Sequence, residues 1–397
     1  MDTEPIPFVF STPVWGAGHT GLFLNVSLPS LLSPGNLPGL ASNAQSRYLI
    51  YTLPEYEKDI RTALSFQRLA RLLPVEIRFI REKIVSPHRA MSDCHIDSFR
   101  RAEEASAAAV FLPPDCVWSD GSMVRLEALT QSGKSVVHIS GIRLDRDGFI
   151  PELGSHYSEN RAVLSLKARG LVAMGLRHLH PIARSHFFNE YEGGLMPANL
   201  VWIVGDEGLL LRCFHLHPLM VKTQVPSAEF KSTIDDDLAL RACPDVTRDY
   251  VVTDSDEILA FEMSGLNHAV GTICLKGSIE GIAAWAEYGA NSRHRELIRH
   301  SIRIHIGPLT EAIWRAKEME SEKVVDAVAS LNRLSLWQVV LKHPTIFVAI
   351  TYTAMLGRRV EGRSGLASVR LLGRIFPFFY LLPFTLHRSF PFLILNF

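Results

Sequence analysis

The sequence lacks several short motifs that mark large enzyme classes. Its 397 residues contain no G-x-x-x-x-G-K-[ST] stretch and no G-x-S-x-G stretch. The first motif builds the phosphate-binding loop of P-loop enzymes, and the second builds the nucleophile elbow of α/β-hydrolases. Their absence argues against a P-loop enzyme or kinase and against an α/β-hydrolase.

Cysteine is scarce, and its spacing excludes two further classes. The five cysteines are Cys94, Cys116, Cys213, Cys243 and Cys274, with no C-x-x-C pair among them. An odd number at wide spacing argues against a disulfide framework or a zinc knuckle and favours a reducing compartment. The N-terminus, MDTEPIPFVF, has no basic stretch followed by an apolar run, so no secretory signal is expected. We therefore expect a cytoplasmic protein.

Net charge is absent as well, but the charges are unevenly distributed. Lys and Arg number 41, as do Asp and Glu, and no nucleic-acid partner is predicted. Residues 331–397 nevertheless carry a net charge of +7 and two apolar runs, Thr345–Leu356 and Ile375–Leu386. Both runs are shorter than the ~18–20 residues that span a bilayer. We expect this region to lie on an anionic membrane surface, at the inner face of the cell membrane, or to pack as helices on the rest of the chain.

The first part of the chain alternates between strand-like and helix-like stretches. The strand-like stretches are residues 7–11, 47–52, 74–80 and 109–115, and the helix-like ones are residues 21–32, 53–73 and 88–109. This alternation predicts an α/β fold with a mostly parallel sheet flanked by helices. In such sheets the ligand binds beyond the carboxyl ends of the strands.

The remainder of the chain is less regular. It is predicted to hold one long helix within residues 156–184, a hairpin in NLVWIVGDEGLLLRC, and a helical region after residue 285 that includes SRHRELIRHSIRIHIG. We accordingly divide the chain into residues 1–285, a catalytic domain, and residues 286–397, a helical C-terminal region that is both basic and apolar.

A glycine-rich turn follows the first strand-like stretch. It reads STPVWGAGHTGLF and contains Pro13, Trp15 and Gly16. Glycines let a backbone approach a ligand closely, and the helix that follows offers its N-terminus to phosphate. We interpret this turn as a ligand-contacting loop rather than as a dinucleotide-binding fingerprint.

Acidic residues follow the predicted fourth strand in PPDCVWSDGS. Asp115 and Asp120 are followed there by Gly121 and Ser122. A carboxylate at this position can hold a divalent cation, which neutralises a diphosphate leaving group. The alternative is a plain turn, because Asp, Gly and Ser are common between strands.

Two later segments offer further metal ligands. In FHLHPLMV, His215 and His217 share one face if the segment is a strand, and imidazole pairs well with carboxylate around a transition metal. The alternative is a pair of structural histidines. In STIDDDLAL, Asp235, Asp236 and Asp237 form either a helix N-terminus or a site for a cation or a sugar hydroxyl.

The segment VVTDSDEILAFEMS places Asp254 and Asp256 after a strand. Such a pair suits divalent-cation binding, or one carboxylate can act as a general base. A solvated loop is the alternative interpretation.

The order of these elements resembles the nucleotide-diphospho-sugar transferase, or GT-A, fold of glycosyltransferases over residues 7–270. The resemblance implies that the first loop contacts the nucleotide and that the acidic motif after the fourth strand binds cation and diphosphate. The family motif D-x-D is replaced here by two aspartates five residues apart. The implied site residues are Pro13, Trp15, Gly16, Asp115, Asp120, Gly121 and Ser122 for the cofactors, Asp120, His215 and His217 for the metal, and Asp236, Asp254 and Asp256 for catalysis.

The function implied by this resemblance is a membrane-associated glycosyltransferase. It would move a sugar from a nucleotide-diphosphate donor to a lipid-linked or cell-surface glycan acceptor, with Mn²⁺ or Mg²⁺. One alternative is a metal-dependent hydrolase or phosphatase that uses His215, His217, Asp235 and Asp254. Another is a non-catalytic scaffold with the same fold at the membrane.

Overall fold

The computed structural model describes residues 5–80, 84, 86–188, 198–230, 233–268, 279–309 and 311–331. The two apolar runs that are predicted to meet a membrane lie outside the described residues. Within the described ranges, every helix is too short or too polar to cross a bilayer.

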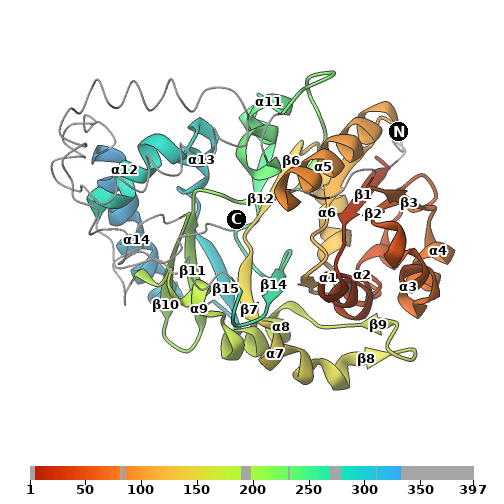
Figure 1. Cartoon of the computed structure of the whole chain (residues 1–397). Helices are drawn as coiled ribbons and strands as arrows, with labels where there is room; N and C mark the ends of the chain where they lie inside the picture. The colour runs from red at the N-terminus through yellow and green to blue at the C-terminus, as the bar shows by residue number, and fades with distance from the viewer. Residues whose placement is uncertain are drawn as a thin grey trace, which may run out of the picture.

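A seven-stranded sheet lies at the centre of the fold (Figure 1). Its strand order is β13-β6-β12-β4-β1-β2-β3, and β12 runs antiparallel to both of its neighbours while the other neighbouring strands are parallel. The predicted α/β class with a mixed, mostly parallel sheet is therefore confirmed. The strands are β1 (Phe8–Pro13), β2 (Arg47–Thr52), β3 (Val75–Phe79), β4 (Ala108–Phe111), β6 (Val136–Ile139), β12 (His217–Val221) and β13 (Asp249–Val251).

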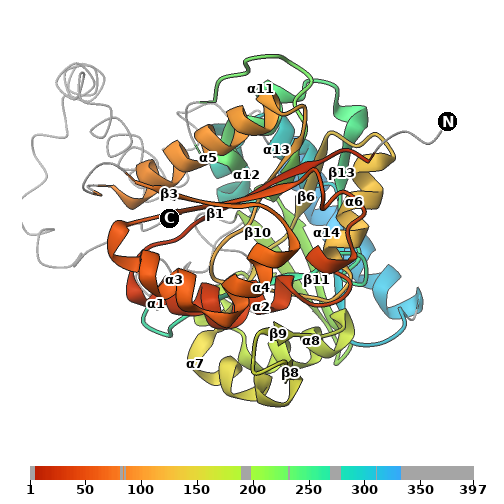
Figure 2. The ribbon, with the colours of Figure 1, turned by 90° about the vertical axis from the view of Figure 1, so that its right-hand side faces the viewer.

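Helices cover both faces of this sheet, because successive strand residues point to opposite sides. Phe8 and Phe10 belong to one buried cluster, and Val9 between them belongs to another. Figure 2 shows α5 above the sheet and α1 to α4 below it. Residues of α6 belong to the same buried cluster as Phe8 and Phe10, so α6 covers the same face as α2 and α4. The bounds of these helices are α1 (Ala17–Leu22), α2 (Leu28–Leu31), α3 (Glu57–Thr62), α4 (Leu64–Leu72), α5 (Pro87–Glu104) and α6 (Ser122–Gln131).

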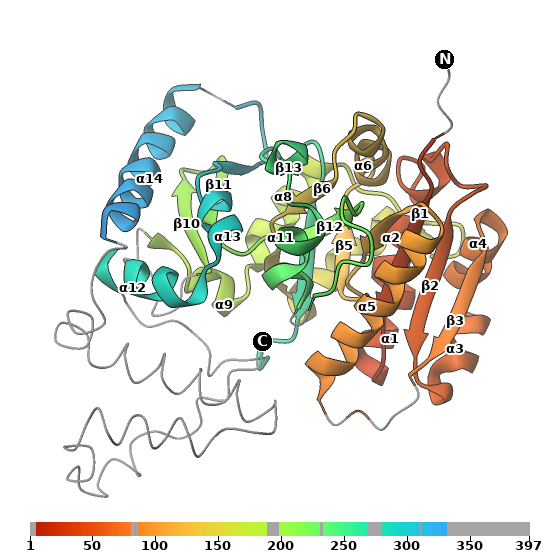
Figure 3. The same cartoon turned by 90° about the horizontal axis from the view of Figure 1, so that it is seen from above.

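A second sheet stands beside the first and carries its own helical layer. The predicted hairpin is confirmed as β10 (Asn199–Val204) and β11 (Gly208–Cys213), and β15 (Ile302–His305) pairs with β11. Trp202 of β10 and Trp314 of α14 lie in one buried cluster that also includes α12. Figure 3 shows this sheet with α12 (Ile279–Gly289) and α14 (Glu311–Leu331) on the side of the molecule opposite β3.

A small third sheet joins the two parts. It consists of β5 (Cys116–Trp118), β14 (Ala260–Ser264) and β7 (Ile142–Asp145), in that order. β14 is antiparallel to β5 and parallel to β7. In Figure 1, β7 and β14 lie between the main sheet and the β10–β11 hairpin. The segment KSVVHISGIRL supplies strands to two sheets, β6 to the main sheet and β7 to the small one.

The prediction of one long helix within residues 156–184 is wrong. The segment contains the short hairpin β8 (Tyr157–Ser158) and β9 (Val163–Leu164), then α8 (Ala168–Gly175) and α9 (Pro181–Arg184). Three successive residues, Glu159 to Arg161, have positive φ angles of 51°, 55° and 69°, so the chain reverses there instead of continuing as a helix.

Two other helical predictions need correction. The stretch SRHRELIRHSIRIHIG is helical only in α13 (Ser292–Leu297), because its second half alternates apolar and polar residues and forms β15. The helix predicted over residues 53–73 is interrupted at Ala63, which is extended with φ −66° and ψ 136°. The proposed boundary between residues 285 and 286 falls inside α12.

Candidate functional site

The main sheet has a topological switch point between β1 and β4. From β1 the chain proceeds outward to β2 and β3 and then returns to place β4 on the other side of β1. The loops that leave the carboxyl ends of two such strands diverge, and ligands of open α/β sheets bind in the crevice between them. The candidate site is therefore built from the loops after β1 and β4.

The loop after β1 is the glycine-rich turn. Pro13 is buried, Trp15 is half-buried, and Gly16 has a φ of +78°, a conformation that favours glycine. A Cβ added at Gly16, Gly18 or Gly21 would meet no protein atom within 4 Å, so space lies open above the turn.

The spacing of these glycines corrects one interpretation of the sequence. Gly16, Gly18 and Gly21 do have the G-x-G-x-x-G spacing, and the turn leads from β1 into a helix that returns to the parallel strand β2. This strand–turn–helix context is the one that a nucleotide-binding fingerprint requires. The distance from Gly21 to the end of β2 is longer than in the common motif, because a loop separates α2 from β2.

The loop after β4 carries Asp115, which lies beside Glu262 of β14. The Met263 amide donates to the Asp115 carbonyl over 2.9 Å, and Glu262 is paired in register with Cys116. Burial raises the pKa of the Asp115 carboxyl above its ordinary value; the Glu262 carboxylate raises it further, and Arg143 opposes both. Glu262 itself forms an ion pair with Arg143 of β7.

Glu262 is the common neighbour of several titratable side chains at this end of the sheet. Its charge acts on His19 of α1, on Asp115 and on His217 of β12. We call His19, Asp115, Arg143, His217 and Glu262 the edge cluster. Glu262 and Arg143 were not singled out from the sequence, since Glu262 stands in the strand AFEMS, where an acidic residue reads as a solvent-facing position.

His217 lies at the edge because β12 begins beside the end of β4. Its Nε2 contacts the Phe111 carbonyl at 2.8 Å. Burial lowers the pKa of His217, while the Phe111 carbonyl and the carboxylates of Asp235 and Glu262 oppose that shift. The carboxylates of Asp235 and Glu262 thus lie near His217, a predicted metal ligand that the structure places at the carboxyl edge.

His215 faces a neighbouring group of residues. Its Nδ1 lies 4.0 Å from Asp235, and its ring stacks on His294 with centroids 4.0 Å apart. Although burial alone raises the pKa of Asp235, hydrogen bonds from His215 and Thr233 hold it below its ordinary value. Asp236 occupies the first turn of a short helical segment, Ile234–Leu238, as the helix N-terminus interpretation predicts.

Asp120 is held by partners outside the edge cluster. Its Oδ1 accepts from the Gly35 amide at 2.6 Å, and its Oδ2 accepts from Lys167 at 2.7 Å. Gly121, the N-cap of α6, has a φ of +108°, and Ser122 is buried with its Oγ 2.9 Å from Ser119 Oγ. The structure therefore does not bring Asp120, His215 and His217 into one group.

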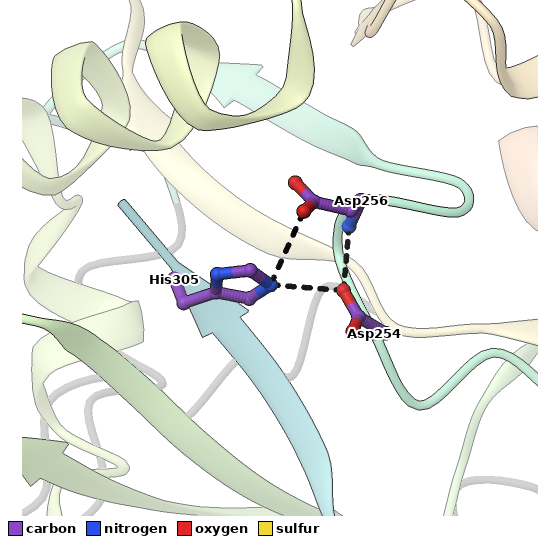
Figure 4. Close-up of side chains that lie close together, drawn as sticks. All are labelled: Asp254, Asp256 and His305. Carbon is purple, nitrogen blue, oxygen red and sulfur yellow. Dashed lines mark hydrogen bonds and ion pairs between the residues drawn. The ribbon is translucent and has the colours of Figure 1, made fainter. Parts of the chain in front are cut away.

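Asp254 and Asp256 meet a residue that the sequence did not point to, His305 of β15. Figure 4 shows His305 Nε2 directed at Asp254 Oδ1, 2.9 Å away, and at Asp256 Oδ2, 3.9 Å away. Three potential ligand atoms thus lie within 4.8 Å of one another, the spacing that a metal ion needs. We call Asp254, Asp256 and His305 the Asp–Asp–His cluster.

The hydrolase alternative required His215, His217, Asp235 and Asp254 to converge. The first three are neighbours at the carboxyl edge. Asp254 instead contacts His305, and its backbone bridges Arg303. The four groups do not form one site in the described structure.

No protein family matches the chain, and no curated protein matches it. Among solved structures, similar chains are the mannosyltransferase PcManGT from Pyrobaculum calidifontis in complex with GDP-Man and Mn²⁺, and S. aureus TarS 1–349. PcManGT is 11% identical with a TM-score of 0.32, covering 94% of this chain and 87% of that one. TarS is 10% identical with a TM-score of 0.25, covering 35% of this chain.

The chain spans 36% of TarS, about a third of its length, and a TarS complex with UDP matches to the same extent. A putative glucose-1-phosphate thymidylyltransferase from Bacillus anthracis is 15% identical with a TM-score of 0.22, covering 36% of this chain and 58% of that one. These likenesses to sugar-nucleotide enzymes are diffuse, with TM-scores of 0.25, 0.22 and 0.32. TM-scores this low assign no residue a role.

Proposed function

We propose that the chain is a glycosyltransferase that takes its sugar from a nucleotide-diphosphate donor. The observation that carries the proposal is the switch point between β1 and β4, where an open glycine turn faces a cluster of acidic and imidazole groups. Phosphates bind where a glycine-rich backbone leads into a helix. A donor diphosphate above Gly16–Gly21 would lie next to Asp115.

The edge cluster offers the groups that sugar transfer needs. A carboxyl whose pKa is raised by burial, such as Asp115, can hold or accept a proton near neutral pH. Arg143, anchored to Glu262, places a fixed positive charge beside the site of the leaving diphosphate.

Asp115, Glu262 and His217 each carry an oxygen or nitrogen atom of the kind that Mn²⁺ or Mg²⁺ accepts, although among the described residues the group with three ligand atoms close together is Asp254, Asp256 and His305. When bound, such an ion would offset negative charge on the diphosphate. Arg143 would position the charged diphosphate, and Asp115 would accept or donate the proton.

A pocket at the ends of β7 and β14 supports an acceptor site beside the donor. It has a volume of about 410 Å³. Its lining residues are Asp145, Arg177, His178, Leu179, Pro181, Arg184, Ser185 and Leu266. We propose a glycan acceptor here, either lipid-linked or at the cell surface. A lipid-linked acceptor would agree with a peripheral position on the inner face of the membrane.

The glycine turn gives a sharp test, because a Cβ added at Gly18 meets no protein atom within 4 Å. Gly18→Val should fold normally but block the approach of phosphate to the backbone. We expect UDP or GDP, titrated calorimetrically with and without Mn²⁺, to bind the wild type and to bind this variant at least about tenfold more weakly. Gly170→Ala, also in open space, is the matched control and should bind normally.

Three outcomes would contradict the proposal. Equal nucleotide binding by wild type and Gly18→Val would remove the turn from the site. Cation binding without any nucleotide effect would favour a hydrolase. Binding of NAD⁺ in place of UDP and GDP would assign the G-x-G-x-x-G spacing to a dinucleotide.

A further inference from the structure

The Asp–Asp–His cluster joins two sheets. Asp254 and Asp256 lie in the loop between β13 and β14, and His305 lies on β15 of the hairpin sheet. The Arg303 amide donates to the Thr253 carbonyl at 2.9 Å, and the Ser255 amide donates to the Arg303 carbonyl at 3.0 Å. These backbone bonds hold the loop against β15, so the three side chains are positioned before any ligand arrives.

The tautomer of His305 directs a ring-nitrogen lone pair at the two carboxylates of the cluster. Its side chain is 2% exposed, and its Nδ1 lies 2.6 Å from the Gly307 carbonyl, which can only accept a hydrogen bond. Nδ1 therefore carries the proton, and in the neutral ring Nε2 presents a lone pair to two carboxylate oxygens. That arrangement is repulsive unless positive charge lies nearby. Arg169 supplies one such charge, because its Nε and Nη2 donate to Asp256 Oδ2 at 3.0 Å and 2.7 Å, and a metal ion between Nε2 and the two carboxylates would supply another.

The geometry suits a metal ion. Two ligand atoms bound to one ion at about 2.1 Å lie about 3.0–3.4 Å apart, and the observed separations of 2.9 Å and 3.9 Å bracket that range. A backbone carbonyl on the far nitrogen is the usual support of a metal-binding histidine. Arg169 of α8 holds Asp256 through Nη2 at 2.7 Å and so orients the second carboxylate.

The cluster lies at the other end of β14 from the edge cluster. Along β14, Ala260 is opposite Trp118 and Glu262 is opposite Cys116, so the strand leads from the Asp254–Asp256 loop toward Asp115. Asp256 and Glu257 lie in a turn, and β14 begins only at Ala260, so the two groups have no residue in common. A ligand on one cluster would not share side chains with the other.

We propose that Asp254, Asp256 and His305 bind one divalent transition-metal ion that fastens β15 to the β13–β14 loop. The ion is structural, and its site is independent of the proposed sugar-transfer site. The side chains of Asp254 and Asp256 are 33% and 36% exposed, which leaves one face open to water ligands and to exchange. One imidazole with two carboxylates favours Mn²⁺, Co²⁺ or Zn²⁺ over Ca²⁺.

Co²⁺ titration of the chelator-treated full chain tests the proposal. Asp256→Asn, a change at a partly exposed position, should weaken one Co²⁺ site at least about tenfold. His305→Gln should do the same, and Asp115→Asn at the edge cluster should keep this site. Hydrogen exchange provides the second readout. Co²⁺ should slow exchange of the β15 amides in the wild type and in Asp115→Asn, but not in Asp256→Asn or His305→Gln.

Two results would overturn the proposal. Wild-type protein that gains no protection in β15 with Co²⁺ would identify His305 as a doubly bonded imidazolium. Co²⁺ affinity unchanged in Asp256→Asn would place the ion elsewhere; this variant decides the matter even if His305→Gln fails to fold.

Discussion

Glu262 sets the electrostatics of the carboxyl edge through its position rather than through any motif. Its negative charge favours the protonated form of every neighbour, whether acid or base. Glu262→Gln should therefore lower the pKa of His19, which the Glu262 charge raises against the effect of burial. A titration of His19 by NMR measures this shift. An unchanged or increased pKa would show that the two side chains do not interact.

Asp115 gives the protein a pH dependence of defined sign. Its pKa rises from 3.8 to about 7 on folding, so between these values the native state binds a proton that the unfolded chain releases. The free energy of unfolding should consequently fall as the pH rises from 3.8 to about 7, and it should keep the lower value at higher pH.

Asp115→Asn removes this contribution. The decrease in unfolding free energy between about pH 5 and about pH 7.5 should be smaller in the variant than in the wild type, as urea denaturation at the two pH values can determine. An equal decrease in both proteins would mean that Asp115 ionises normally.

Site residues could be predicted from the sequence where they directly follow a predicted strand. Asp115 was found in this way because the position after a central strand has a meaning of its own. His305 was not, since IRIHI was assigned to a helical region and its alternation was overlooked. Glu262 carries no local signal at all, because its role arises from the pairing of β14 with β5 and β7.

At the scale of elements, the contact between β11 and β15 depends on a glycine. A Cβ added at Gly208 would lie 1.9 Å from the Ile304 carbonyl oxygen, a backbone atom that cannot move without separating the strands. Gly208→Ala should lower the free energy of unfolding by about 1–3 kcal/mol, measured by urea denaturation.

Gly170→Ala in α8 is the control for that substitution. A Cβ at Gly170 meets nothing within 4 Å, and alanine favours a helix over glycine by about 0.5–1 kcal/mol. This variant should be as stable as the wild type or slightly more stable. Equal losses in the two variants would indicate a general intolerance of glycine substitution rather than a clash at β15.

Elements were predictable where the local pattern and the tertiary context agree. β2 was predicted to the residue, because RYLIYT is an uninterrupted strand-like run between turns. The helix expected in residues 156–184 failed because helix-forming residues such as Leu164 and Leu171 are used to fill a core from separate short elements. Propensity alone does not contain that information.

At the scale of the whole molecule, a buried charge network ties α13 to the main sheet. Arg293 of α13 forms an ion pair with Asp249 of β13, and His138 of β6 lies 3.4 Å from the same carboxylate. Arg293 also donates to the Cys243 carbonyl at 2.6 Å. Arg293→Met would leave Asp249, whose side chain is only 12% exposed, without its cation, and we expect a loss of about 3–5 kcal/mol in the free energy of unfolding.

Arg295→Met on the same helix is the comparison. Arg295 is 39% exposed and pairs with Glu287 at 3.6 Å, so its loss should cost about 0–1 kcal/mol. Chemical denaturation of both variants separates the two cases. Similar small losses would mean that the network around Asp249 is dispensable.

The antiparallel strand β12 has a consequence for biosynthesis. It is made more than seventy residues after β6, yet it supplies the hydrogen bonds that connect β6 to β4. On the ribosome, β1 to β4 can assemble as soon as they emerge, while β6 must wait with an unpaired edge until β12 arrives. This interval is when the nascent chain is most exposed to misassociation, and a chaperone that recognises extended apolar segments would act on VVHI.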